Sequence, residues 1–188
     1  MRVIGGKFKG KKLLEPKDKE TRPLKDLTKE SIFNIINHSN KFSIDIKKAY
    51  ILDLFSGVGS FGIECLSQGA KHVTFIERYE GVLPILKNNL NNFKSEINYE
   101  IIESDILNKF EFKSLKFRYD LIFLDPPYRE KALENILNTI IKNKILTDNG
   151  IIIIHRHKNK IDIFPKNFKI IQEKKYGISK IIFLSYLN

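Results

Sequence analysis

The sequence predicts an α/β protein with a mostly parallel sheet that helices cover on both faces. From Tyr50 onward, strand-like and helix-like segments alternate along the chain, which is typical of parallel sheets. A glycine-rich turn at 57–62 joins the first of these strands to the first helix, as in nucleotide-binding folds. Four acidic residues also lie at or near strand ends. Because the carboxyl ends of parallel strands meet at one edge of the sheet, we expect a ligand site there.

The segment before Tyr50 is predicted to be a basic extension. Thirteen basic and six acidic residues give residues 1–48 a net charge of +7, against +4 for the rest of the chain. Glycines punctuate residues 1–12 and predict a short hairpin, which would pack on the main body or order on a partner, because a lone hairpin is marginal in water. Pro23 precedes a predicted helix from near Asp26 to His38. We therefore expect an extension of residues 1–48 and a main domain of residues 49–188.

Apolar runs and their periodicity predict the elements of the main domain. Short apolar runs predict strands at 50–55, 72–77, 99–105, 119–124 and 150–155. Helical periodicity predicts helices at 60–69, 80–92 and 134–144. The tail predicts two further strands, 168–177 and 178–187, which meet at Gly177 and form an antiparallel pair that closes the sheet edge.

Composition limits the compartment and the partners. Hydrophobic residues make up 42% of the chain and aromatic residues 11%, which argues against disorder. With no apolar run of bilayer-spanning length and no signal-peptide core, the chain is expected to be cytoplasmic and away from membranes. The single cysteine, Cys65, predicts core filling rather than a disulfide or metal site. A net charge of +11 indicates a polyanionic partner, although an AT-rich genome would also enrich lysine.

The turn from Gly57 to Gly62 has the pattern G-x-G-x-x-G, which by itself would serve NAD equally well. Asp53 lies just before it and the turn holds no basic residue, so a pyrophosphate would be repelled. S-adenosylmethionine has no phosphate and carries an ammonium and a sulfonium, which suit Asp53. Glu77 could bind both ribose hydroxyls, and the amides that open the helix could receive the carboxylate. The acidic residues therefore favour a methyl donor over a dinucleotide.

The stretch Asp125-Pro126-Pro127-Tyr128 follows a buried strand. Its two prolines force a stiff, extended loop that presents a carboxylate, a backbone carbonyl and an aromatic ring. The carboxylate and the carbonyl can accept hydrogen bonds from one amino group, while the ring stacks on a planar base. This combination indicates a catalyst acting on the exocyclic amine of a nucleobase; the alternative is a proline-rich turn that only ends a strand.

Together these motifs resemble the class I methyltransferases that modify amino groups. The segments 2–13, 22–36, 52–70 and 123–128 resemble the RsmD family more specifically. The resemblance implies a Rossmann-like sheet and methylation of N2 of a guanine in 16S ribosomal RNA, within the small ribosomal subunit or its assembly intermediate. Leu24, Leu27 and His155 depart from the pattern, because a Thr, a basic residue and an acid are expected there.

The predicted site residues form three groups, and we expect a monomer that needs no metal. The catalytic residues are Asp125, Pro126 and Tyr128. The residues that bind S-adenosylmethionine are Asp53, Phe55, Gly57, Gly59, Glu77, Arg78, Asp105 and Ile106. The residues that bind RNA are Arg2, Lys7, Lys9, Lys11, Lys12 and Arg22, although Arg22 could instead contact the methionine carboxylate of the cofactor.

Other interpretations remain open at this stage. The same loop could act on DNA adenine or a protein glutamine, but the basic hairpin and the lack of a separate DNA-recognition domain favour RNA. A non-catalytic RNA-binding assembly factor would not need the loop at 125–128. Phe55 and Phe61 are expected to pack rather than to stack on bases. His155-Arg156-His157 is expected to be a basic surface cluster near the RNA rather than a metal site or a catalytic base.

Overall fold

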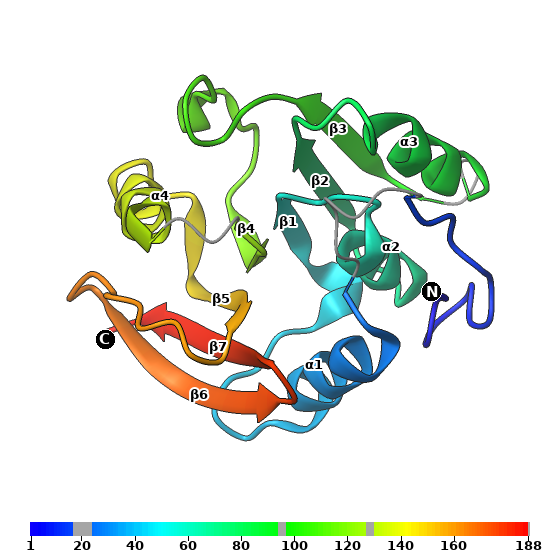
Figure 1. Ribbon diagram of the computed structural model, residues 1–188. Coiled ribbons are helices and arrows are strands. Elements are labelled where there is room, and N and C mark those ends of the chain that lie inside the picture. The colour runs from blue at the N-terminus through cyan, green and yellow to red at the C-terminus, as the bar shows by residue number, and fades with distance from the viewer. Residues whose placement is uncertain (17–23, 94–96, 127–129, 188) are drawn as a thin grey trace.

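A seven-stranded sheet forms the centre of the protein (Figure 1). The computed structural model describes residues 1–16, 24–93, 97–126 and 130–187. The strand order across the sheet is β3-β2-β1-β4-β5-β7-β6. β1 to β5 pair in parallel, whereas β7 lies antiparallel between β5 and β6. The strands are β1 (Tyr50–Leu54), β2 (His72–Glu77), β3 (Tyr99–Glu103), β4 (Tyr119–Leu124), β5 (Leu146–His157), β6 (Phe168–Tyr176) and β7 (Ser179–Tyr186).

The predicted fold class is confirmed, including the antiparallel pair that ends the chain. Helix α1 (Asp26–His38) has the predicted bounds, whereas the other helices are shifted or shorter: α2 (Ser60–Ser67), α3 (Leu83–Asn91) and α4 (Glu130–Lys142). α2 ends early because Gly69 takes a left-handed conformation, with φ of 96°. α3 begins late because Pro84 fits only the first turn of a helix. Among the described residues, no helix has both the length and the apolar character needed to cross a bilayer.

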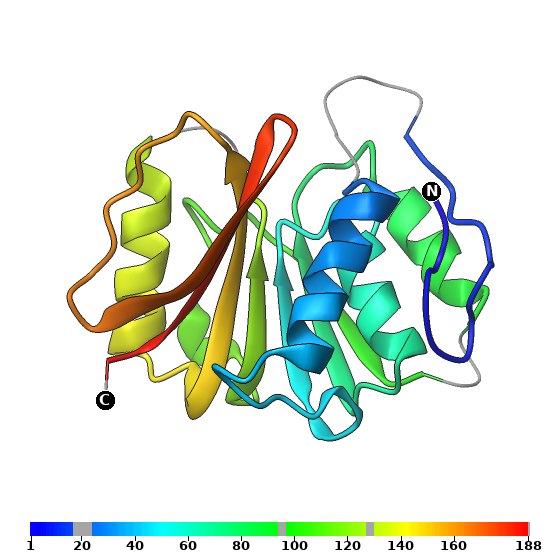
Figure 2. The ribbon, with the colours of Figure 1, turned by 90° about the horizontal axis from the view of Figure 1, so that it is seen from below.

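Helices cover the two faces of the sheet and bury two separate groups of apolar side chains (Figures 1 and 2). Side chains of α1, α2 and α3 share one core, and those of α4 belong to the other. In the first core, the Phe61 ring stacks on Phe123 of β4 at 4.1 Å between centroids, and on Phe33 of α1 at 5.4 Å. Phe61 is therefore a packing residue, as predicted, and it holds α2 against the sheet next to the glycine turn.

The basic N-terminal segment packs on the main body. Its hairpin is reduced to one antiparallel bridge, between Arg2 and Lys12, with Val3 and Phe8 buried. The backbone N–H of Lys7 donates to the Ser67 carbonyl at 2.7 Å, and that of Phe8 donates to the Ser67 hydroxyl at 2.9 Å. The expectation that the segment leans on the rest of the chain is confirmed, and Figure 1 shows it beside α2 and α3.

A fully buried ion pair fastens this segment. Lys29 of α1 and Glu64 of α2 both have 0% exposed side chains, and their charged atoms lie 3.3 Å apart. The Lys29 ammonium also donates to the Arg2 carbonyl at 2.7 Å. The Glu64 carboxylate accepts the backbone N–H groups of Ile4 at 2.9 Å and Gly5 at 2.7 Å. Two charged side chains are thus stable in the core because each is paired and also hydrogen-bonded.

Removing one member of this pair should destabilise the protein strongly. Glu64→Gln or Lys29→Met leaves the other charge buried without its partner, which costs about 3–5 kcal/mol of unfolding free energy. The double variant leaves no buried charge and keeps an acceptor for the Gly5 N–H, so its loss should be smaller than the sum of the two. Urea unfolding of the parent, the two single variants and the double variant measures these free energies.

A matched control is the exposed pair Lys48–Asp45, whose side chains are 87% and 54% exposed. Lys48→Met should leave the unfolding free energy unchanged, because exposed ion pairs contribute little. Additive losses in the Lys29 and Glu64 variants would contradict a coupled buried pair.

Candidate active site at the carboxyl edge of the sheet

The strand register brings the four predicted carboxylates to one edge of the sheet. Asp53 of β1 is paired with Phe123 of β4, so Asp125 follows two residues beyond that pair. Glu77 is paired with Glu103, and Asp105 follows two residues beyond it. The charges of Asp125 and Glu77 both act on Asp53. The predicted clustering of these acids at the carboxyl ends of parallel strands is therefore present.

The glycine turn is shaped by left-handed backbone conformations. Phe55, Gly57 and Gly59 have φ of 61°, 53° and 84°. At Gly59 a Cβ would also lie 2.5 Å from the Leu86 Cδ1 atom, and the left-handed backbone there favours glycine whatever the space. The Gly57 N–H donates to the Glu77 carboxylate at 2.7 Å, which fixes the turn against β2.

Asp53 is the most deeply buried acid of the site, with 1% of its surface exposed. Its carboxylate accepts the Gly62 N–H from α2 at 2.9 Å. Burial, together with the nearby charges of Asp125 and Glu77, raises the pKa of Asp53 to about 8, and the Gly62 hydrogen bond opposes the shift. A cationic ligand placed next to Asp53 would therefore be favoured.

Glu77 is held by three backbone N–H groups. One carboxylate oxygen accepts those of Arg78 and Tyr79, both at 2.8 Å, and the other accepts that of Gly57 at 2.7 Å. A carboxylate offers about four acceptor positions, so roughly one remains for a further donor. Binding both hydroxyls of a ribose would then displace one backbone hydrogen bond. The bidentate contact stays a prediction, and the geometry favours one hydroxyl.

Asp105 and Arg78, both assigned to the cofactor, contact each other. The Arg78 guanidinium lies 2.8 Å from the Asp105 carboxylate, which also accepts the Asn108 amide at 2.8 Å and the Leu107 N–H at 2.9 Å. Burial alone would raise the pKa of Asp105, but these donors outweigh it and lower the pKa. Asp105 is thus held as an anion, and Ile106 beside it is buried in the second core.

The proposed catalytic loop is described only in part. Asp125 is partly exposed and Pro126 is buried, directly after β4. Tyr128, like Arg22 of the RNA group, lies outside the described residues, so their assigned roles stay predictions. His155, which was not among the predicted site residues, has its Nδ1 atom 3.0 Å from an Asp125 carboxylate oxygen. The sequence carried a signal for this contact, because parallel strands that pair Leu124 with Ile154 place the next residues side by side.

The expected surface cluster at 155–157 is wrong for Arg156. Arg156 is 2% exposed, and its guanidinium contacts the buried Asp162 carboxylate at 2.9–3.0 Å. Successive residues of a strand point to opposite faces, so His155 and Arg156 separate. His155 shares a sheet face with the first core and Asp125, whereas Arg156 lies on the face of the second core.

The five described residues of the predicted RNA group have exposed side chains: Arg2, Lys7, Lys9, Lys11 and Lys12. The Lys11 ammonium covers the rings of Phe8 and Phe93, at 5.1 and 4.8 Å from their centroids. A hollow of about 610 Å³ separates the segment from α1, and Arg2, Lys9 and Asn34 are among the residues that line it. The segment therefore presents cations beside a polar recess.

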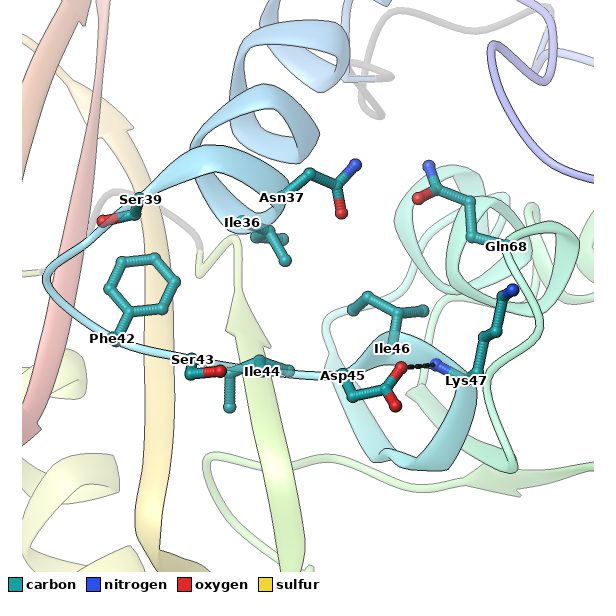
Figure 3. A pocket seen from close by; sticks show the side chains of 10 residues that line it. All are labelled: Ile36, Asn37, Ser39, Phe42, Ser43, Ile44, Asp45, Ile46, Lys47 and Gln68. Atoms are coloured by element: carbon teal, nitrogen blue, oxygen red, sulfur yellow. Dashed lines mark hydrogen bonds between the residues drawn. The ribbon is translucent and has the colours of Figure 1, made fainter.

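A second hollow, of about 300 Å³, lies far from the glycine turn along α2 (Figure 3). Gln68 at the carboxyl end of α2, Phe42, Asp45 and Lys47 are among its lining residues, whereas the glycine turn precedes the amino end of the same helix. None of the predicted site residues that the structure describes lines this hollow.

Comparison with known proteins places the chain among methyltransferases. Residues 1–185 match the sequence model of a family described as Conserved hypothetical protein 95. The protein named Ribosomal RNA small subunit methyltransferase D in Haemophilus influenzae is 34% identical over 95% of this chain and 90% of its own length. The protein of that name in Buchnera aphidicola is 33% identical over 100% of this chain and 92% of its own length. A solved structure described as "Putative methyltransferase yhhF" from Escherichia coli has a TM-score of 0.80 and 29% identity, covering 99% of this chain and 97% of that one.

Asp53 should impose a pH dependence on stability. Between its ordinary pKa of 3.8 and its folded pKa of about 8, the folded protein keeps a proton that the unfolded chain has released. Stability should therefore fall as pH rises, by about 1.4 kcal/mol per pH unit from this one group. Asp53→Asn removes the titration, so urea unfolding at about pH 5, 6 and 7 should show a difference between variant and parent that grows with pH. Parallel curves for the two proteins would show that burial does not protonate Asp53.

Proposed function

The chain belongs to the family described as Conserved hypothetical protein 95, which is the RsmD family that its motifs resemble. On this premise we propose that the protein methylates N2 of a guanine in 16S ribosomal RNA, with S-adenosylmethionine as methyl donor. The observation that carries the proposal is the placement of Asp53 and Asp125 at one edge of the sheet. Asp53 is buried, and a cation bound beside it would be favoured. Asp125 begins a loop whose acceptors suit an amine. The two relatives above are named as small-subunit rRNA methyltransferases, which supports the choice of RNA class.

The residues of the edge fit S-adenosylmethionine better than a dinucleotide. When bound, this cofactor supplies an electrophilic methyl group on a positively charged sulfur. Asp53 would attract the cationic methionine end of this cofactor. The positive charge of the bound cofactor would in turn favour the ionised form of the Asp53 carboxylate. Glu77 would accept a ribose hydroxyl at its remaining acceptor position. The left-handed backbone conformations of Gly57 and Gly59 shape the turn that would face the cofactor.

Asp125 and Pro126 would orient the amine that accepts the methyl group. The lone pair of a guanine amine is delocalised into the ring, which makes the amine a poor nucleophile. Hydrogen bonds from its two N–H groups to the Asp125 carboxylate and the Pro126 carbonyl would favour a more tetrahedral nitrogen with a localised lone pair. Orientation of this kind can contribute several kcal/mol to the rate. Tyr128 would stack on the base, as the sequence predicts.

An unpaired or flipped guanine is the substrate that this geometry favours. N2 of a paired guanine is engaged within the RNA helix, and RNA-modifying proteins reach bases in loops or by flipping them out. The cations of residues 1–12 would bind phosphates on either side of the target.

Methyl transfer to small ribosomal subunits tests the proposal directly. Subunits from a strain lacking this protein should accept labelled methyl groups from S-adenosylmethionine at one guanine, mapped by nuclease digestion and mass spectrometry. Asp125→Ala should lower the single-turnover rate by on the order of 10²-fold or more, because it removes an interaction made mainly in the transition state, while S-adenosylhomocysteine affinity stays unchanged. No labelling of subunits, or labelling of an adenine, would overturn the assigned reaction; calorimetry with NAD provides the control for the cofactor.

The basic segment should control the salt dependence of RNA binding. Deleting residues 1–12 would remove the buried Val3 and Phe8, so substitution is the cleaner test. The triple variant Lys7→Ala, Lys9→Ala and Lys12→Ala should weaken binding and make the slope of log affinity against log salt shallower, by roughly 0.7–0.9 for each phosphate that the variant no longer binds. Lys11 is kept because it packs on two rings.

The control variant removes the same charge elsewhere, by changing the exposed β6 residues Lys169, Lys174 and Lys175 to Ala. Its salt slope should match that of the parent. Equal slopes in all three proteins would mean that the N-terminal lysines are a solvated surface and that RNA binds elsewhere.

A further inference from the structure

His155 is placed to act on Asp125. The two residues follow the register pair Leu124–Ile154 on adjacent parallel strands, so they share one face of the sheet. The imidazole Nδ1 atom lies 3.0 Å from a carboxylate oxygen of Asp125, and the two side chains are 17% and 31% exposed. No hydrogen bond from the described residues reaches the second carboxylate oxygen of Asp125, which could therefore accept one from a substrate.

Among the described residues, Asp125 is the charged group that contacts His155 and raises the pKa of its imidazole. On β7 the residue paired with His155 is the apolar Ile181. On its own strand, Arg156 is bound to Asp162, and Lys180 of β7 also contacts Asp162 at 3.4 Å. Asp53 lies beyond Asp125 on β1, and Lys29 of α1 is paired with Glu64.

We propose that His155 is a positioning residue that acts through the Asp125 carboxylate. Methyl transfer then depends on the neutral form of the His155 imidazole. The inference rests on the proposed function. The neutral imidazole lies 3.0 Å from one oxygen of Asp125 in a contact that is not an aligned hydrogen bond, and it leaves the carboxylate its full charge for the amine. Protonated His155 forms an ion pair that neutralises this charge and weakens the carboxylate as an acceptor.

The pH at which this change occurs follows from the same contact. Burial would lower the pKa of His155, but the neighbouring Asp125 carboxylate raises it above 6.5 overall. The ion pair stabilises the fold fully below pH 6.5, and this stabilisation is lost as pH rises through the folded pKa. The methylation rate should change in the opposite direction, rising over the same range. Stability and rate should therefore have opposite pH trends.

Single-turnover methylation measured against pH tests the proposal. With saturating S-adenosylmethionine and subunits, the parent rate should rise through the His155 titration. His155→Asn fills a similar place beside Asp125 but cannot titrate, so this limb should disappear while the rate at high pH stays close to that of the parent. S-adenosylhomocysteine affinity should not change. His157→Asn, two residues along the same strand, is the control and should keep the limb.

A limb that persists unchanged in His155→Asn would overturn the inference and would assign the titration to another group, of which Asp53 is the nearest candidate. Proton NMR gives a readout that does not need methylation. The His155 titration midpoint should fall in Asp125→Asn, because the raising charge is removed; an unchanged midpoint would also overturn the inference. If the parent methylates no subunit at any pH, the proposed function fails, while the NMR titration still reports on the pair.

Discussion

The buried Lys29–Glu64 pair determines how the two halves of the proposed site are joined. Glu64 lies in the middle of α2, a helix of eight residues whose amino end carries the glycine turn. Its carboxylate holds Ile4 and Gly5 of the basic segment, while the Gly62 N–H of the same helix binds Asp53. One short helix therefore sets the distance between the segment proposed to bind RNA and the edge proposed to bind the methyl donor. Because a buried ion pair needs further hydrogen bonds to offset its desolvation, the segment cannot leave this position without destabilising the core.

A second polar contact reinforces the same arrangement from α3. The Asn89 side chain is fully buried and binds both the N–H and the carbonyl of Leu14, at 2.8 and 3.2 Å. It also donates to the Val58 carbonyl within the glycine turn at 3.1 Å. The end of the basic segment and the proposed cofactor turn thus share one amide side chain. The Asn89 side chain itself is buried, and these bonds satisfy its polar atoms, which explains how a polar residue can occupy the core at this point.

The sequence was sufficient where local patterns decide the structure. Apolar periodicity predicted the bounds of β2, β4 and α1, and the order of strands predicted that Asp53, Glu77, Asp105 and Asp125 would meet at one edge. It was insufficient where a charged side chain is buried. Lys29, Glu64 and Arg156 are of residue types usually found at the surface, and their ion-pair partners make their burial possible. Lys29 and Glu64 are also far apart in the sequence. The contact between His155 and Asp125 lies between these cases, because register implies it only once the pairing of β4 with β5 is known.

The basic and acidic regions of the protein would have different functions in the proposed reaction. The chain carries a net charge of +11, yet the edge of the sheet concentrates carboxylates. An RNA backbone is attracted to the lysines of the N-terminal segment and repelled by the acidic edge, whereas an uncharged base with amine donors meets acceptors there. Burial raises the pKa of Asp53 to about 8, and a cationic methyl donor placed beside it would favour the ionised carboxylate. The cofactor would then be bound in the cationic form that can react and released more easily once its sulfur has lost its charge.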